Sequence, residues 1–247
     1  MSVSLLHRSV NWICTESEAR SWAIPPSQIV QAIIRQMFYL IGVNHNAQRH
    51  PPGSNLDADQ SELQRCLEKA ISEHHPTLIA VEESDDTLFN EKTGVVDASI
   101  PRNIALQHGI RITFCEPPKD EKDRIGYTCK SDILRDLFTA GMLNDVPSGM
   151  HGTAAHAVEI AVMFPKREKC WIERLKDHLH SEVVLVLGED HIESFGRRLE
   201  ALGIGSKVIC SGIGVSNAQK MEFEAAKRFP IQHAELFRAM IRQIGGG

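Results

Sequence analysis

Two histidines in this sequence follow apolar, strand-like runs at the same distance. In FYLIGVNH the apolar run is broken by Gly42, and His45 comes three residues later. In VVLVLGEDH the run ends at Gly188, and His191 again comes three residues later. A glycine there lets the chain turn sharply out of a strand, so that the imidazole can lie over the end of a sheet. Imidazole is a common neutral metal ligand and a base near neutral pH. The repeated Gly-x-x-His spacing therefore indicates two halves of one site.

Carboxylates follow two further apolar runs. TLIAVE ends at Glu82 with Glu83 beside it, and IRITFC is followed by Glu116. The carboxyl ends of parallel strands meet at one edge of a sheet, where ligands bind. Two imidazoles with one or two carboxylates suit a divalent cation that polarises a carbonyl or activates a water. We therefore expect a divalent metal cation on His45, Glu82 and His191. Neighbours on a strand point opposite ways, so the choice between Glu82, Glu83 and Glu116 stays open.

The elements that must position these residues alternate between strand and helix from Phe38 onward. Strand-like runs cover 38–43, 77–82, 110–115, 183–188 and 207–210, and helical patterns cover 56–75, 99–109, 166–180 and 192–203, with two more helices and a break near Pro230. This alternation predicts right-handed β-α-β crossovers and a mostly parallel sheet. We expect an α/β fold with flanking helices, in which residues 37–247 form a single domain with a helical insertion at about 119–165.

Residues 1–36 have no clean hydrophobic period, and two interpretations remain. They are either an N-terminal extension or a covering helix, because Ile29, Ile33 and Met37 lie on one helical stripe. They lack the basic-then-apolar layout of a signal peptide, and no apolar run reaches the roughly 18–20 residues that span a bilayer. A net charge of −5 gives no electrostatic footprint for nucleic acid. We therefore expect neither membrane nor nucleic acid among the partners.

The six cysteines contain no C-x-x-C pair and no regular spacing. This pattern argues against a zinc ribbon or a disulfide framework and favours a reducing, cytoplasmic location. Cys115 and Cys210 close strand-like runs, where a buried, inert thiol is expected. His156 and Glu159 lie at i, i+3, a spacing that can ligate a metal, and form a weaker candidate. No nucleophile elbow and no phosphate-binding loop is present.

Taken together, four segments resemble the TraB/TIKI superfamily, which is related to erythromycin-esterase-like proteins. They are IGVNH (41–45), LIAVE (78–82), REKCWIERL (167–175) and VVLVLGEDHIESFGRRLEALGI (183–204), within a resemblance that covers roughly 37–210. The resemblance implies an α/β fold and, for some members, metal-dependent hydrolysis of peptide or ester bonds. Carried over position by position, it implies that His45, Glu82, Arg167 and His191 are catalytic.

Three classes of function are compatible with these residues. The leading hypothesis is a metal-dependent hydrolase that acts on an ester, amide or peptide bond of a small-molecule or peptide substrate, with Gly42 and Gly188 at the bound group. The alternative is a non-catalytic protein that holds haem or another small molecule with the same histidines. A third is a partner-recruiting module that docks through its helical middle.

Overall fold

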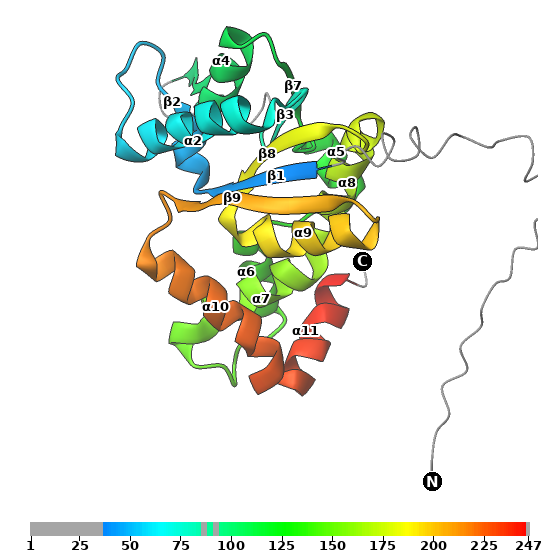
Figure 1. Cartoon of the computed structure of the whole chain (residues 1–247). Coiled ribbons are helices and arrows are strands. Elements are labelled where there is room, and N and C mark those ends of the chain that lie inside the picture. Colours follow the sequence, from blue (N-terminus) through cyan, green and yellow to red (C-terminus); the bar gives the residue numbers. More distant parts are fainter. Residues whose placement is uncertain (1–36, 85–87, 91–93, 246–247) are drawn as a thin grey trace, which may run out of the picture. The chain divides into compact units, whose positions relative to one another are not determined.

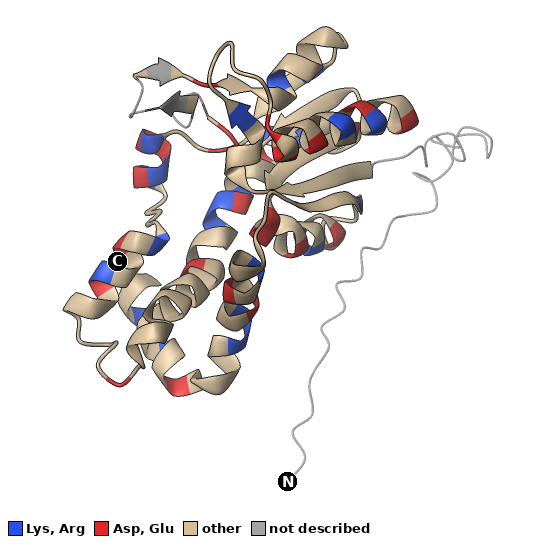
Figure 2. Ribbon diagram, turned by 90° about the vertical axis from the view of Figure 1, so that its left-hand side faces the viewer, with Lys and Arg blue, Asp and Glu red and all other residues tan. Residues whose placement is uncertain are grey.

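The computed structural model describes residues 37–84, 88–90 and 94–245, and the expectation for residues 1–36 lies outside them. Figure 1 shows a sheet with helices on both of its faces. In Figure 2 the strands of this sheet carry few charged residues, which lie mainly on the helices and loops. No helix in the described ranges has the length and apolar character needed to cross a membrane.

The described residues form a sheet of five strands, all parallel, in the order β7-β3-β8-β1-β9. The strands are β1 (Met37–Val43), β3 (Leu78–Val81), β7 (Arg111–Phe114), β8 (Glu182–Gly188) and β9 (Gly205–Ile213). The expected α/β fold is thereby confirmed. β8 lies between β1 and β3, so that the two Gly-x-x-His strands are neighbours and Val43 pairs with Gly188. β9 extends beyond the expected 207–210 at both ends.

Helices cover each face of the sheet because successive strand residues point to opposite sides. On β1, Tyr39 and Ile41 pack with α2 (Ala58–His74) and α4 (Ile100–Gln107). Phe38 and Leu40 pack on the other face with α8 (Phe164–Leu175) and α9 (Ile192–Ala201). Burial of each such side chain contributes about 1.5–3 kcal/mol. This two-sided covering explains why β1 and β8 read as continuous apolar runs.

The helix boundaries follow local chemistry in the expected way. Asp57 caps α2, because its side chain accepts the Gln60 N–H while the Gln60 side chain accepts the Asp57 N–H. Pro76 lies two residues beyond the end of α2 and cannot continue it. At the end of α4, Gly109 adopts a φ of 65°, the left-handed conformation that ends many helices.

The helix that contains Arg167 is longer than the sequence indicated. Short 3₁₀ turns, α7 (His151–Val158), a π segment (Glu159–Met163) and α8 join into one 31-residue helix. The expected end of the helical insertion, at about 165, therefore falls inside this helix. Pro165 has no N–H to donate, and the chain absorbs it with a π turn in which the Phe164 N–H bonds to the Glu159 carbonyl.

The helical region has a core of its own, which also draws on the C-terminal helices. α6 (Lys130–Thr139) and α7 pack with α10 (Asn217–Gln232) and α11 (Ala234–Gly245) around buried side chains that include Ile133, Val158, Phe229 and Met240. α10 runs through Pro230 and ends two residues later. We call this group of four helices the helical cluster. The remaining elements are α5 (Lys119–Arg124), the ladder of β2 (Arg49–His50) with β6 (Ala98–Ser99), and the ladder of β4 (Phe89–Asn90) with β5 (Val95–Val96).

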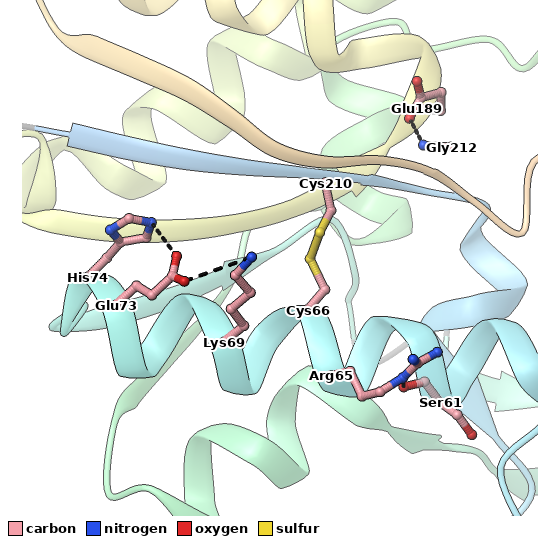
Figure 3. Close-up of a disulfide and its surroundings, with 9 residues drawn as sticks. All are labelled: Ser61, Arg65, Cys66, Lys69, Glu73, His74, Glu189, Cys210 and Gly212. Atoms are coloured by element: carbon pink, nitrogen blue, oxygen red, sulfur yellow. Dashed lines mark hydrogen bonds and ion pairs between the residues drawn. A yellow bond between two sulfur atoms is a disulfide. The ribbon is translucent and has the colours of Figure 1, made fainter.

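The expectation that Cys210 is an inert thiol is wrong. Cys210 on β9 forms a disulfide with Cys66 on α2, with 6.8 Å between the two Cα atoms (Figure 3). The sequence gives no sign of the pair, because 144 positions separate the two residues and only the fold brings α2 against β9. Cys115 is buried as expected, and burial raises the pKa of its thiol to about 12. A cytoplasmic location stays a prediction, which a disulfide makes less favourable.

The disulfide predicts a measurable loss of stability on reduction. Opening a loop of this length costs about 3–5 kcal/mol on the chain-entropy account. A variant with both Cys66→Ser and Cys210→Ser should therefore have a free energy of unfolding about 3–5 kcal/mol lower than that of the wild type. Its midpoint of urea unfolding should be lower as a result. Cys170→Ser, which changes a free thiol, is the matched control. Equal midpoints for the double variant and the wild type, or alkylation of Cys66 in denatured, unreduced protein, would contradict the disulfide.

Candidate functional site

The carboxyl ends of three neighbouring strands bring the predicted residues together. His45 begins a 3₁₀ turn (His45–Gln48) just after β1, and His191 ends a 3₁₀ turn (Glu189–His191) after β8. Glu82 follows β3 directly. Its Oε1 atom lies 3.6 Å from His45 Nε2 and 3.8 Å from His191 Nε2. The two Gly-x-x-His motifs thus share one carboxylate, which is the arrangement expected from their spacing.

Arg167 lies at the centre of the site and is almost fully buried. Its Nη2 atom donates to Glu82 Oε1, and Nη2 and Nε donate to Glu116 Oε2 at 2.8 and 3.2 Å. Nη1 donates to His191 Nε2 at 3.1 Å. A guanidinium has five N–H donors. Four are used in these contacts, so one N–H on Nη1 has no partner among the described residues.

Glu82 is a permanent anion in this surrounding. Burial alone would raise the pKa of Glu82, but the positive charge of Arg167, together with smaller contributions that include the Gly188 N–H, outweighs burial and holds that pKa at about 2. The Gly188 N–H donates to Glu82 Oε2 at 2.6 Å. Because a carboxylate of such low pKa is a weak base, its role here is to hold the buried Arg167 guanidinium.

The two glycines of the motifs are needed for close approach. A Cβ atom on Gly188 would lie 3.1 Å from His45 Nε2 and 3.2 Å from Glu82 Oε2. A Cβ atom on Gly42 would overlap Glu189 Oε2, which accepts the Gly212 N–H from β9 at 2.7 Å (Figure 3). Each glycine therefore leaves room for a carboxylate at a strand end. Contact of either glycine with a bound group stays a prediction.

His191 is held on both of its ring nitrogens. Nδ1 lies 3.0 Å from Glu168 Oε1, and a carboxylate accepts, so Nδ1 carries the proton. Nε2 accepts from Arg167, so that its lone pair is engaged. Phe164 stacks on the ring with 3.7 Å between centroids. The imidazole is thus a fixed, buried part of the support around Arg167.

His45 has a different environment from His191. Its side chain is 50% exposed, whereas that of His191 is 3% exposed. The Gln48 side chain lies at 3.2 Å from His45 Nδ1 and orients the ring. His45 is therefore the histidine of the pair that a ligand can reach.

The structure separates the roles of the three glutamates that the sequence left open. Glu82 and Glu116 both bind Arg167, and Glu116 also accepts from Trp171 Nε1 at 3.3 Å and pairs with Lys122 at 2.6 Å. Glu83 has a different partner, because its Oε2 atom accepts from Ser99 Oγ at 2.6 Å. Burial, which outweighs the Ser99 hydrogen bond and Arg49, raises the pKa of Glu83 to about 7.

Two cavities meet at His45 and Arg167. One, of about 300 Å³, opens toward the helical cluster and is also lined by His156, Glu159 and Asp190. The other, of about 250 Å³, is also lined by Gln48, Glu82, Glu83, Glu116, Lys122 and Tyr127. A substrate group that enters either cavity reaches the same imidazole and guanidinium.

The weaker candidate pair is on the wall of the larger cavity. His156 Nε2 lies 3.4 Å from Asp190 Oδ2. Glu159 accepts the backbone N–H of Lys130 at 3.2 Å. These two side chains thus have separate protein partners, and metal binding by them stays a prediction.

Sequence reasoning missed three side chains that complete the site. Glu168 fixes the His191 ring, Gln48 contacts His45, and Tyr127 lies 5.5 Å from the Arg167 guanidinium. Glu168 follows Arg167 directly and Gln48 follows His45 by three residues, so proximity in sequence was the available signal. Tyr127, on a loop between α5 and α6, gave none.

A divalent cation can bind at the site only where side chains have lone pairs that no protein group engages. Within the described ranges, no group of three or more His, Cys, Asp and Glu side chains is arranged to hold a metal ion. The Arg167 guanidinium bridges Glu82 and His191, two of the three expected ligands. As arranged, the three residues do not form a metal site, and the bound cation stays a prediction.

Comparisons of the chain with protein-family models, curated protein sequences and solved structures find no match. The resemblance to the TraB/TIKI superfamily therefore stays a prediction.

The raised pKa of Glu83 predicts how stability responds to pH. The folded state holds a proton on this carboxyl between pH 4.5 and about 7 that the unfolded state has lost, so its contribution falls as the pH rises through that window. Glu83→Gln removes the cost of ionising this buried carboxyl, which the shift in its pKa puts at about 3 kcal/mol at pH 8. The variant should be more stable than the wild type at pH 8 and nearly equal at pH 4.5, by urea unfolding.

Glu62→Gln, on the exposed side of α2, is the control, and its stability relative to the wild type should be the same at both pH values. A Glu83→Gln variant that is less stable than the wild type at pH 8 would mean that the buried carboxylate is satisfied as an anion.

Proposed function

We propose that the protein is a hydrolase of an ester, amide or peptide bond, with its site at the carboxyl edge of the sheet. The observation that carries the proposal is the pairing of a half-exposed imidazole with a buried guanidinium that keeps one N–H without a partner among the described residues. His45 and Arg167 line both cavities. A base and a fixed positive charge on one cavity wall are the two groups that addition of water to a carbonyl requires.

The chemistry assigned to each residue follows from its surroundings. His45 takes a proton from a water molecule as that water attacks the substrate carbonyl. Negative charge then develops on the carbonyl oxygen, and the remaining Nη1 N–H of Arg167 donates to it. Glu82 keeps the guanidinium in place, because it contacts Arg167 and remains ionised. The leaving group departs with the proton that His45 returns.

A divalent cation is the part of this proposal that the geometry favours least. Arg167 already places positive charge against Glu82, and a second cation there would have to displace it. A bound cation would polarise the carbonyl or lower the pKa of water, and His45 is the expected ligand that remains accessible. Elemental analysis of wild type beside a variant with His45→Ala and His191→Ala decides the matter, because a resident metal should be stoichiometric and lost in the variant.

The alternative of a haem-binding or other non-catalytic binding protein has less support. Both nitrogens of His191 are engaged by protein groups, so His191 is not free as an axial ligand. A visible absorption band in the purified protein would revive this alternative.

His45→Ala should abolish hydrolysis while leaving the fold intact, because the ring is half exposed. The assay is a panel of chromogenic esters, arylamides and short peptides with the purified full chain. His108→Ala, which makes the same substitution at an exposed position after α4, should retain full activity. Hydrolysis by wild type that survives His45→Ala would remove His45 from the mechanism.

Arg167→Lys tests the other half of the pair. A lysine cannot contact Glu82, Glu116 and His191 together, since it lacks the planar fork of donors. We expect kcat to fall by at least about 100-fold, the loss typical for an oxyanion donor. Breaking a buried ion pair also costs about 3–5 kcal/mol of stability. Circular dichroism and urea unfolding of the variant therefore serve to separate a loss of catalysis from a loss of the fold.

A further inference from the structure

Gln48 is the side chain that orients the ring of His45. It ends the 3₁₀ turn that His45 begins, and it is 1% exposed. Its Nε2 atom faces His45 Nδ1 at 3.2 Å. A buried amide thus makes a side-chain hydrogen bond to a half-exposed imidazole. Whatever proton the ring carries on Nδ1 depends on which end of this amide faces it.

With the amide nitrogen toward the ring, the arrangement has two defects. Nδ1 must then accept, so the proton of a neutral His45 lies on Nε2. In that tautomer the one lone pair of the ring is engaged by Gln48, and the ring can act neither as a base nor as a ligand. In addition, Gln48 Oε1 is buried without a hydrogen-bond partner. An unpaired buried acceptor costs about 1–3 kcal/mol. Both defects arise from the same orientation of the amide.

Turning the amide by 180° corrects both defects. Its carbonyl then accepts from His45 Nδ1–H, and Nε2 keeps its lone pair. The two ends of an amide are nearly equal in size, so the turn needs no repacking. The NH₂ group then replaces an unpaired acceptor.

The opposing influence on the ring is the negative charge of Glu82. Its Oε1 atom lies 3.6 Å from His45 Nε2, which attracts a proton to that nitrogen. The distance exceeds the 2.7–3.2 Å range of a hydrogen bond, and the Glu82 carboxylate is already bound by Arg167 and the Gly188 N–H. The contact with Gln48 is the shorter of the two and is buried on the Gln48 side, which favours the proton on Nδ1.

We propose that Gln48 is a positioning residue whose carbonyl holds His45 in the Nδ1–H tautomer and so leaves Nε2 free to act. The proposal deepens the proposed function and rests on it only for the reaction that Nε2 performs. The same tautomer is required if His45 binds a metal, because a ligating imidazole donates its other N–H to a protein acceptor.

The test is the protonation pattern of the His45 ring in the ¹⁵N-labelled full chain, treated with EDTA, at a pH where the ring is neutral. Long-range ¹H–¹⁵N spectra distinguish a protonated from an unprotonated ring nitrogen, and the His45 signals are those missing from His45→Ala. We expect Nδ1 to carry the proton in wild type and in Gln48→Glu, whose carboxylate can only accept. In Gln48→Leu the proton should move toward Nε2. Gln64→Leu, on the outer side of α2, is the control.

A proton on Nε2 in wild type overturns the proposal, whatever the variants do. An unchanged tautomer in Gln48→Leu overturns it as well. If hydrolysis is found, Gln48→Leu should lower kcat by about 10–100-fold, the loss typical when the side chain that orients a functional histidine is removed. KM should be nearly unchanged, and Gln48→Glu should retain more activity. If no substrate is hydrolysed while His45 is the Nδ1–H tautomer, the proposed function fails and the role of Gln48 stands.

Discussion

The burial of a guanidinium at the ends of parallel strands is the interaction on which the candidate site depends. Removing Arg167 from water is costly, and the cost is offset only because Glu82 and Glu116 bind it from two sides. Lys122 lies against the other oxygen of Glu116. Two positive and two negative charges are thus fixed as a unit. His45, half exposed at the margin of this unit, keeps the freedom to meet a ligand.

The joined helix contacts two different cores, that of the helical cluster and that beneath the sheet, with different faces. Val158 on α7 lies in the core of the helical cluster, whereas Trp171 on α8 lies in the core beneath the sheet. Each residue of an α-helix turns the chain by about 100°. The extra residue of the π turn rotates everything after it by a comparable angle. This rotation, at the point where Pro165 would disrupt a regular helix, turns Arg167 and Glu168 toward the strand ends.

The strands and the sheet edge could be predicted because their signals are local. Apolar runs that end at Gly42 and Gly188 indicate buried strands, and polar residues after such runs indicate the carboxyl edge. The order of the strands could not be predicted, since the place of β8 between β1 and β3 is decided by packing between distant segments. The pairing of Cys66 with Cys210 depends on the same long-range packing. A π turn is also invisible in sequence, where Pro165 reads as a helix boundary.

The residue types at the strand ends could be read from the sequence, but the contacts between them could not. Sequence patterns can count imidazoles and carboxylates, but they cannot show which lone pairs are already engaged. His45 and His191 look equivalent in their motifs, yet Glu168 and Arg167 occupy both nitrogens of His191. The two histidines therefore have different roles. His191 supports the buried Arg167 guanidinium, whereas His45 is half exposed and lines both cavities. A guanidinium in contact with Glu82 supplies positive charge that the residue types alone would assign to a metal.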